Sequence, residues 1–288
     1  MMSHIRTIAL SAVLVTALSA CSDTLPNVEP DFTATAVLNL QTGEIDMPLD
    51  EYDIAARWAD DALLEHALRI AVLPCMEAHG HSYTAAHVQD DPASSVGERT
   101  YGIWNVEHAQ KYGYGAGANP VNTAEAADQA AAADPEQWSN DRYACFTEAK
   151  QQISNIYPAD YLTSSEVVGR IGADAYALAQ KDPQWQAARD EYAACLTEHG
   201  LVAASGPGEW GSTASAAPGF DWESEEAMRV AITEAQCNTD TQLSQRLANL
   251  EAAYQAPLIK QHEAELQRIA DDKSARLAAA ESYIAQHG

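Results

Sequence analysis

Four cysteines in the body of the chain constrain its fold more than any other feature, because disulfides between them would fix which segments lie together. They are Cys75, Cys145, Cys195 and Cys237, and each stands in a segment of helical character. An even number of cysteines is typical of a disulfide framework in an exported chain, and four cysteines allow three pairings. The compartment decides whether they pair, since the cytosol keeps thiols reduced.

The N-terminus has the features of a bacterial export signal that ends in a lipid-attachment site. Arg6 provides positive charge, and the apolar run 8–18 is too short to cross a bilayer, which takes about 20 residues. Such a run is typical of a signal-peptide core. It ends in Leu18-Ser19-Ala20-Cys21, a lipobox pattern with small residues before the cysteine. We therefore expect residues 1–20 to be a lipoprotein signal peptide; an ordinary cleaved signal with a chance cysteine is the alternative.

Lipid on Cys21 would hold the chain on the cell membrane, facing outside the cytoplasm. Two acyl chains on one residue anchor a protein stably, because each buried methylene contributes about 0.8 kcal/mol. Residues 21–50 are polar and contain Pro26, Pro30 and Pro48, and we interpret them as a flexible tether. In that location the four remaining cysteines oxidise.

The composition predicts an all-α protein that does not bind nucleic acid. The formal net charge of −26 repels phosphates. The acidic residues are spread along the chain, which favours a role in solubility; a cation-binding surface is the alternative. Alanine, the best helix former, is abundant, whereas phenylalanine occurs only 3 times. Residues 33–40 are the one short stretch with a strand-like pattern.

Two of the cysteine segments look like one structural unit used twice. Cys75 begins the run Cys-Met-Glu-Ala-His-Gly and Cys195 the run Cys-Leu-Thr-Glu-His-Gly, each at the expected end of a helix with glycine after it. We therefore expect two related helical halves, 51–157 and 158–240. Pairing within each half gives Cys75–Cys145 and Cys195–Cys237, and each bridge stabilises by about 3–4 kcal/mol in the chain-entropy model.

The same two runs allow a rival interpretation, a zinc site. A cysteine and a histidine four residues apart share a helix face, and zinc accepts both. Export oxidises thiols, however, and His79 and His199 are also favourable near a helix C-terminus, where they interact with the helix dipole. We therefore expect no metal and no cofactor.

Residues 241–288 predict a long C-terminal helix. Apolar residues recur on one stripe at steps of three and four. Pro257 would bend this helix. The stripe packs either along the body of the protein or against a partner, and the sequence leaves both open. Its members include Leu243, Leu247, Leu250, Tyr254, Leu258, Leu266 and Ile269.

Two irregular segments carry the candidate binding residues. Exposed aromatic side chains hold sugars or peptide partners in many proteins. Alternatively, buried aromatic side chains order these two loops against the helices. The candidates are Tyr101, Trp104, Tyr112 and Tyr114 in the first segment, and Trp210 and Trp222, with Phe220, in the second.

No catalytic motif is found in the sequence. It has no Gly-x-Ser-x-Gly, no His-Glu-x-x-His and no phosphate-binding loop. The glycine-rich run 113–117 is accompanied by no strand and no basic residue of a phosphate site, so we interpret it as a loop. We therefore expect no enzymatic activity.

Several of these features together resemble a family of secreted actinobacterial lipoproteins of unknown function. The resemblance covers most of the mature chain, implies an outward-facing lipoprotein of a single-membrane host, and supplies no catalytic residues. It is carried by the Leu-Ser-Ala-Cys lipobox, Cys75-Met76 ahead of Gly80, Tyr101-Gly102-Ile103-Trp104, Tyr112-Gly113-Tyr114, Cys195, Cys237 and Ala253-Tyr254-Gln255.

The expected function is non-catalytic binding of a partner protein or ligand at the cell envelope. One alternative is a solute-binding lipoprotein of a transporter, although the alternation of strands and helices typical of such proteins is missing. The other is an envelope hydrolase, which a strongly shifted carboxylate in a deep cleft would favour.

Overall fold

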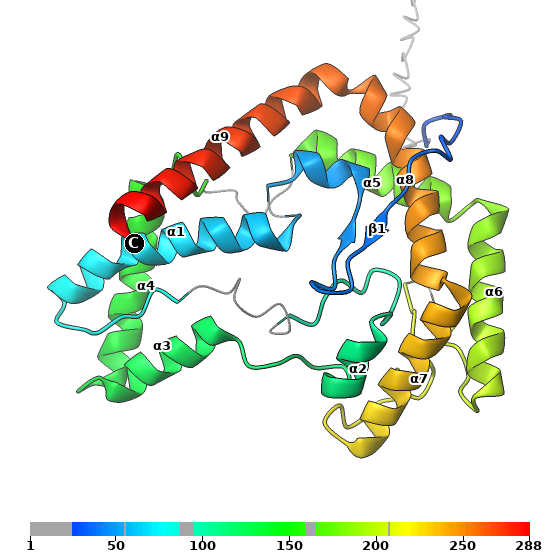
Figure 1. Cartoon of the computed structure of the whole chain (residues 1–288), viewed down its shortest axis with the longest axis horizontal. Coiled ribbons are helices and arrows are strands. Elements are labelled where there is room, and N and C mark those ends of the chain that lie inside the picture. The colour runs from blue at the N-terminus through cyan, green and yellow to red at the C-terminus, as the bar shows by residue number, and fades with distance from the viewer. Residues whose placement is uncertain (1–24, 55, 87–94, 159–164, 207) are drawn as a thin grey trace, which may run out of the picture.

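The structure is a computed structural model that describes residues 25–54, 56–86, 95–158, 165–206 and 208–288. The expected signal peptide (1–20) and Cys21 lie outside these residues. The described chain is mostly helical, as the sequence predicts, with one short hairpin (Figure 1). Within it, no helix is both long enough and apolar enough to cross a membrane.

A first group of helices is built around α1 (Trp58–Ala78). It packs between α4 (Pro135–Gln152) and α9 (Glu263–His287), and α3 (Pro120–Ala131) lies against α4. The core of this group is formed by large apolar side chains from all three central helices. They include Leu64, Leu68, Val72, Met76, Trp138, Ile153 and Ala280.

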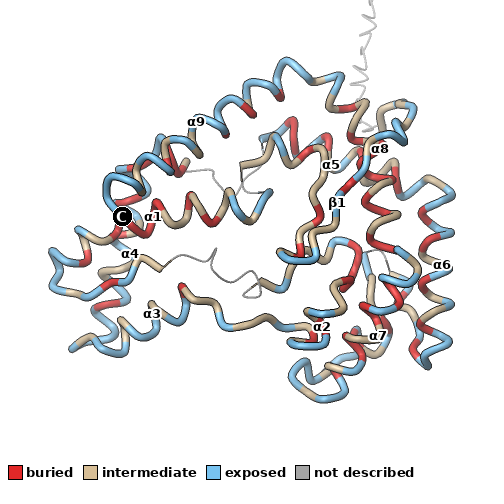
Figure 2. The backbone as a smooth tube through the Cα atoms, viewed as in Figure 1, coloured by how far each residue is buried: buried red, intermediate tan, exposed pale blue. Residues whose placement is uncertain are grey.

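A second group contains α6 (Pro183–Glu198), α7 (Glu225–Thr241) and α8 (Leu243–Gln261), which pack on one another. The remaining helices cover this group: α5 (Glu166–Ala179) lies along α8, and α2 (Val106–Tyr112) lies along α7. In Figure 2, buried segments recur at intervals along α6 and α9 between exposed ones, as expected for helices that cover a core with one face.

Helix starts follow the side-chain signals in the sequence. Asp134 caps α4 by accepting from the backbone N–H of Glu136, and Asp182 caps α6 by accepting from the N–H of Gln184. Each aspartate is followed by a proline at the first helical position, where the missing proline N–H costs nothing.

Two disulfides each join a pair of helices. Cys75–Cys145 links α1 to α4, and Cys195–Cys237 links α6 to α7, with Cα atoms 5.6 Å apart in both. These are the pairs that the two-halves interpretation favoured. Two disulfides in one chain are typical of a domain that folds outside the cytoplasm.

The N-terminal segment differs from the flexible tether expected for residues 21–50. From residue 25 onward it is packed on the body: β1 (Val37–Leu38) pairs antiparallel with β2 (Ile45–Asp46), and the 3₁₀ helix η1 (Pro48–Tyr52) follows. Ala36, Ile45 and Leu49 are buried in the helical cores. The three prolines of this segment suggested flexibility, whereas the apolar side chains between them are held by tertiary contacts.

A proline creates the first attachment point of this segment. Pro257 lies within α8 and has no N–H to donate to the carbonyl of Ala253. The backbone N–H of Asp31 donates to that carbonyl instead, at 2.8 Å. The carbonyl of Ala253, left without its helical donor by Pro257, thus accepts a hydrogen bond that fixes the N-terminal described segment.

The long C-terminal helix is α9, and it is separate from α8. The expected helix over 241–288 is interrupted at His262, after Pro257, and α7 passes into α8 through Gln242, whose φ of 55° is left-handed. The apolar stripe of α9 packs on η1 and α5 near its start and on α1 farther along, so it covers the body of the protein.

The core clusters cross the expected boundary between halves at residue 157. Tyr101 and Trp104 belong to the same cluster as Trp185 and Leu247, although they precede the boundary. Conversely, Ala280 near the C-terminus packs with Leu64 of α1. The boundaries of the two halves themselves stay predictions.

Lys273 fastens α9 to the start of α1, and its replacement tests this link. Its buried ammonium donates to the carbonyls of Asp50 (3.0 Å) and Asp53 (2.8 Å) and pairs with the carboxylate of Asp60 at 2.8 Å. Lys273→Met should lower the free energy of unfolding by about 3 kcal/mol, because it leaves buried acceptors and one carboxylate unpaired. Urea denaturation measures this loss.

The matched control is Arg229→Met, which removes an exposed ion pair with Glu226. Its unfolding midpoint should stay at the wild-type value, since exposed pairs contribute little. Equal midpoints for the two variants would show that Lys273 does not hold α9.

Candidate functional site

The two aromatic loops of the sequence meet in space along α7, from Asn238 near its C-terminal end to Trp222 just before its start. The first loop precedes and follows α2, and the second joins α6 to α7. Gly102 makes their approach close, since its φ is +88° and an added Cβ would lie 3.1 Å from the Cβ of Trp210. A larger residue at 102 would separate the loops.

The inner layer of this junction is a set of buried and half-buried rings in edge-to-face contact. The centroid of the Tyr101 ring lies 5.9 Å from that of Trp185 and 5.7 Å from that of Trp210. Tyr176 of α5 lies 5.5 Å from Trp185. Such pairs contribute about 0.5–1.5 kcal/mol each beyond area burial, so this layer anchors both loops.

A buried carboxylate holds the inner layer in place. The hydroxyl of Tyr101 donates to Glu251 of α8, which also accepts from the Gln255 amide at 3.1 Å. Burial raises the pKa of Glu251 and of Tyr101, and these hydrogen bonds offset part of that effect on Glu251. The arrangement needs one proton between the two oxygens, which the tyrosine supplies.

The outer layer of the junction reaches the surface. The Tyr114 ring lies 4.9 Å from Trp222 and 6.1 Å from Phe220, and these two rings lie 5.0 Å apart. Trp222 is 55% exposed, whereas Tyr114 and Phe220 are half-buried. The three residues come from both loops, so the exposed aromatic surface exists only when the loops are joined.

A second buried carboxylate lies beneath the outer layer. Glu234 is 1% exposed and accepts from the Tyr114 hydroxyl (2.6 Å), the Ser212 N–H (2.7 Å) and the Ser215 hydroxyl (2.9 Å). The Arg99 guanidinium donates to the carbonyl of Tyr114 at 2.8 Å, and burial lowers the pKa of Arg99. Charge and hydrogen bonds together position Tyr114.

A cleft opens beside Trp210, between α6 and the second loop. Its volume is about 270 Å³, close to the lower limit for small-ligand sites. The Arg189 guanidinium lies 4.9 Å from the centroid of the Trp210 ring and donates to the carbonyl of Glu209. The lining combines one aromatic wall with cationic, anionic and amide groups, which suits a polar ligand or a protein side chain. The polar side chains of the lining are Gln186, Arg189, Asp190, Tyr192, Ser205 and Glu209.

The candidate aromatic residues are divided between core and surface. Tyr101 and Trp104 are buried, at 1% and 5% exposure, so neither contacts a ligand at the surface. For these two the alternative applies, in which buried rings order the loop. Tyr112, Tyr114 and Trp210 are half-buried. Trp222 alone of the six is mostly exposed.

Sequence reasoning missed the cationic and acidic partners of these rings. Arg189 lies on α6, the helix that directly precedes the loop with Trp210. Nothing in the sequence around Arg189 indicates that it contacts an aromatic ring. Glu234 stands in a helical run of ordinary polarity and becomes notable only through its burial. Their side-chain types occur throughout the chain, so no local signal identifies them.

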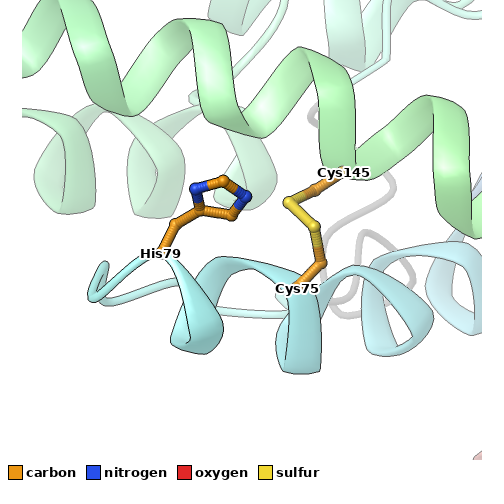
Figure 3. Close-up of side chains that lie close together, drawn as sticks. All are labelled: Cys75, His79 and Cys145. Carbon is orange, nitrogen blue, oxygen red and sulfur yellow. A yellow bond between two sulfur atoms is a disulfide. The ribbon is translucent and has the colours of Figure 1, made fainter.

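The histidine–cysteine groups of the zinc interpretation are present but oxidised. In each of the sets Cys75, His79, Cys145 and Cys195, His199, Cys237 the candidate ligand atoms lie within 4.8 Å of one another. Figure 3 shows the His79 ring beside the sulfur–sulfur bond. Zinc binds thiolates, and a disulfide offers none. His79 and His81 instead approach Asp141, at 3.5 Å and 2.8 Å.

Two carboxyl groups have strongly raised pKa values, which bears on the hydrolase alternative. Burial raises the pKa of Asp50 to about 7 and that of Asp61 to about 6. Asp50 accepts from the Met47 N–H at 2.7 Å at the start of η1, and Asp61 lies in the first turn of α1 beside Glu65. Neither lines the cleft beside Trp210.

No family model, curated protein or solved structure matches this chain. A function for the chain must therefore be inferred from its own sequence patterns and from the geometry described above. That geometry is a junction between two loops, with an exposed aromatic cluster and a cleft.

Removal of one hydroxyl tests the hold of Glu234 on the outer layer. Tyr114→Phe should lower the free energy of unfolding by about 1–3 kcal/mol, because a buried carboxylate loses a donor. Tyr143→Phe is the matched control, since Tyr143 is 76% exposed. Denaturant midpoints of the two variants are compared, and a Tyr114→Phe midpoint as high as that of the control would contradict the proposed hold.

The pKa of Asp50 predicts how stability depends on pH. A carboxyl group whose pKa is higher in the folded than in the unfolded state stabilises folding while neutral, and that contribution is lost as pH rises from about 4 to 7. The loss is a few kcal/mol at most, since one pKa unit is worth about 1.4 kcal/mol. Asp50→Asn keeps an acceptor for Met47 and cannot ionise.

Chemical denaturation at pH 5 and pH 8 measures this effect. The wild type should lose more stability between the two values than Asp50→Asn does. Asp271→Asn on α9 controls for loss of a negative charge alone. Identical pH dependence in the wild type and Asp50→Asn would show that Asp50 ionises without cost.

Proposed function

We propose that this chain is a lipoprotein, anchored through lipid on Cys21, that binds a partner protein or ligand outside the cytoplasm without transforming it. The cleft of about 270 Å³ beside Trp210 carries the proposal. Two disulfides support the compartment, and the Leu-Ser-Ala-Cys pattern supports the anchor. Non-catalytic binding is supported by the position of the shifted carboxyl groups outside that cleft.

The second part of the proposal is that the two disulfide-linked helix pairs are related units. In both, the first cysteine is followed four residues later by histidine and then by a glycine with φ of +79°. The residue after the glycine donates its backbone N–H to the carbonyl of the residue after the cysteine. The N–H of His81 donates to Met76 in the first unit, and the N–H of Leu201 donates to Leu196 in the second. A shared helix end with a shared bridge favours duplication within the chain. Kinship with the secreted actinobacterial lipoproteins that the sequence resembles stays a proposal.

A photo-crosslinking residue in the cleft tests the binding function. Gln186 lines the cleft, is exposed, and donates to Asp190 four residues later. Gln267 on α9 is also exposed and donates to Asp271 in the same way. A benzophenone side chain in place of Gln186 should form one discrete adduct in intact cells, and one in place of Gln267 should not.

Reversing one charge in the cleft tests whether the adduct at position 186 depends on binding in the cleft. Asp190→Lys should reduce the adduct at position 186 by about tenfold, since misplaced like charges at an interface cost several kcal/mol. Asp271→Lys should leave it unchanged. The binding proposal fails if both crosslinking positions give the same products and if amino acids, sugars and peptides leave the melting temperature unmoved.

A further inference from the structure

We infer that the surface around Phe32 lies against the lipid bilayer and that the outer layer of the aromatic junction, with Trp222, is held away from it. This inference rests on the proposed lipid on Cys21. It concerns a separate matter, namely which surface of the body the anchor brings to the membrane.

The anchor gives the body little freedom. Only four peptide links separate Cys21 from Leu25, the first described residue, and they span at most about 14 Å when fully extended. A flexible tether over residues 21–50 would have allowed any orientation. A link this short restricts the body to orientations in which Leu25 is close to the lipid head groups.

The chain is fixed to the body immediately after Leu25. Val28 packs against the cluster that contains Leu258 and Val167. Asp31 donates to the Ala253 carbonyl at 2.8 Å, and Ala36 donates its N–H to the Asn249 side chain at 3.0 Å. These contacts attach residues 28–36 along α8, so the place where the link to Cys21 begins is fixed relative to α8.

Phe32 projects from this attached segment. It is 59% exposed, and it borders a shallow groove of about 180 Å³ whose lining includes Leu250 and Arg246. Lys260, which is exposed, attracts the neighbouring carboxylate of Asp31. Aromatic rings and long cationic side chains are the groups that favour the interface between head groups and acyl chains.

The outer layer of the aromatic junction, with Trp222, lies at the other end of the same column of helices, whereas the inner layer is bonded to Glu251, two residues from Ala253. From Ala253 the chain of α8 and α7 runs back to Glu225, next to Trp222, over about 40 Å of helix at 1.5 Å per residue. In Figure 1 the start of α7 and the dark-blue segment beside α8 lie at opposite ends of the α7–α8 column. A bilayer at Phe32 therefore leaves the outer layer of the junction open to partners outside the membrane.

Lipid crosslinking from matched aromatic positions tests this inference. Full-length lipidated protein in phosphatidylcholine vesicles carries p-benzoylphenylalanine in place of Phe32, or in place of Trp222, which has a similar exposure of 55%. Mass spectrometry should find lipid adducts at position 32 and only background at position 222. A spacer of about twenty Gly and Ser residues inserted before Leu25 should reduce the adducts by about tenfold, since effective concentration falls with linker length.

The outcomes separate this inference from the proposed function. An N-terminal peptide without lipid on Cys21 would overturn both. A lipidated protein that labels lipid equally at positions 32 and 222 would overturn the membrane-facing surface only. Crosslinking of position 32 to a protein in native membranes would also overturn it, because a partner would then cover Phe32.

Discussion

Two buried tyrosine–glutamate hydrogen bonds hold the first aromatic loop on the helices, and the candidate site depends on them. Tyr101 donates to Glu251 of α8, and Tyr114 donates to Glu234 of α7. A buried carboxylate without donors is costly, so each glutamate favours the one loop position that supplies a hydroxyl. The ring contacts with the second loop depend on this placement of the first loop. Trp210 contacts Tyr101, and Trp222 contacts Tyr114.

Pro257 has a comparable effect on the start of the chain. A proline inside a helix leaves a carbonyl without its usual donor, and the structure supplies one from Asp31, more than two hundred residues earlier. This contact and the burial of Ala36 and Ile45 make the polar segment from residue 25 to residue 50 part of the fold. The described body therefore begins four residues after Cys21, so the proposed anchor would leave it little freedom of orientation.

The local features of this fold could be predicted from sequence, and the long-range ones could not. Asp134-Pro135 and Asp182-Pro183 are local signals for two helix starts, because capping is a contact between neighbours in the chain. The repeated cysteine runs favoured the two disulfides that the structure contains. Periodicity predicted an apolar stripe near the C-terminus but not its partner, α1, and it gave no sign of the interruption at His262. The burial of Tyr101 was open for the same reason, since a pattern of rings does not say what covers them.

The acidic charge of the chain must be reconciled with the proposed position close to a membrane. A net charge of −26 would be repelled by anionic head groups, yet the repulsion between exposed charges is screened beyond about 8 Å at physiological salt. Only the surface next to the anchor lies within that range. There Lys260 attracts the carboxylate of Asp31, whereas the Arg246 guanidinium is already paired with Glu191 at 2.6 Å. The proposed approach to the membrane therefore depends on the lipid and on screening of the acidic charge, and local attraction adds little.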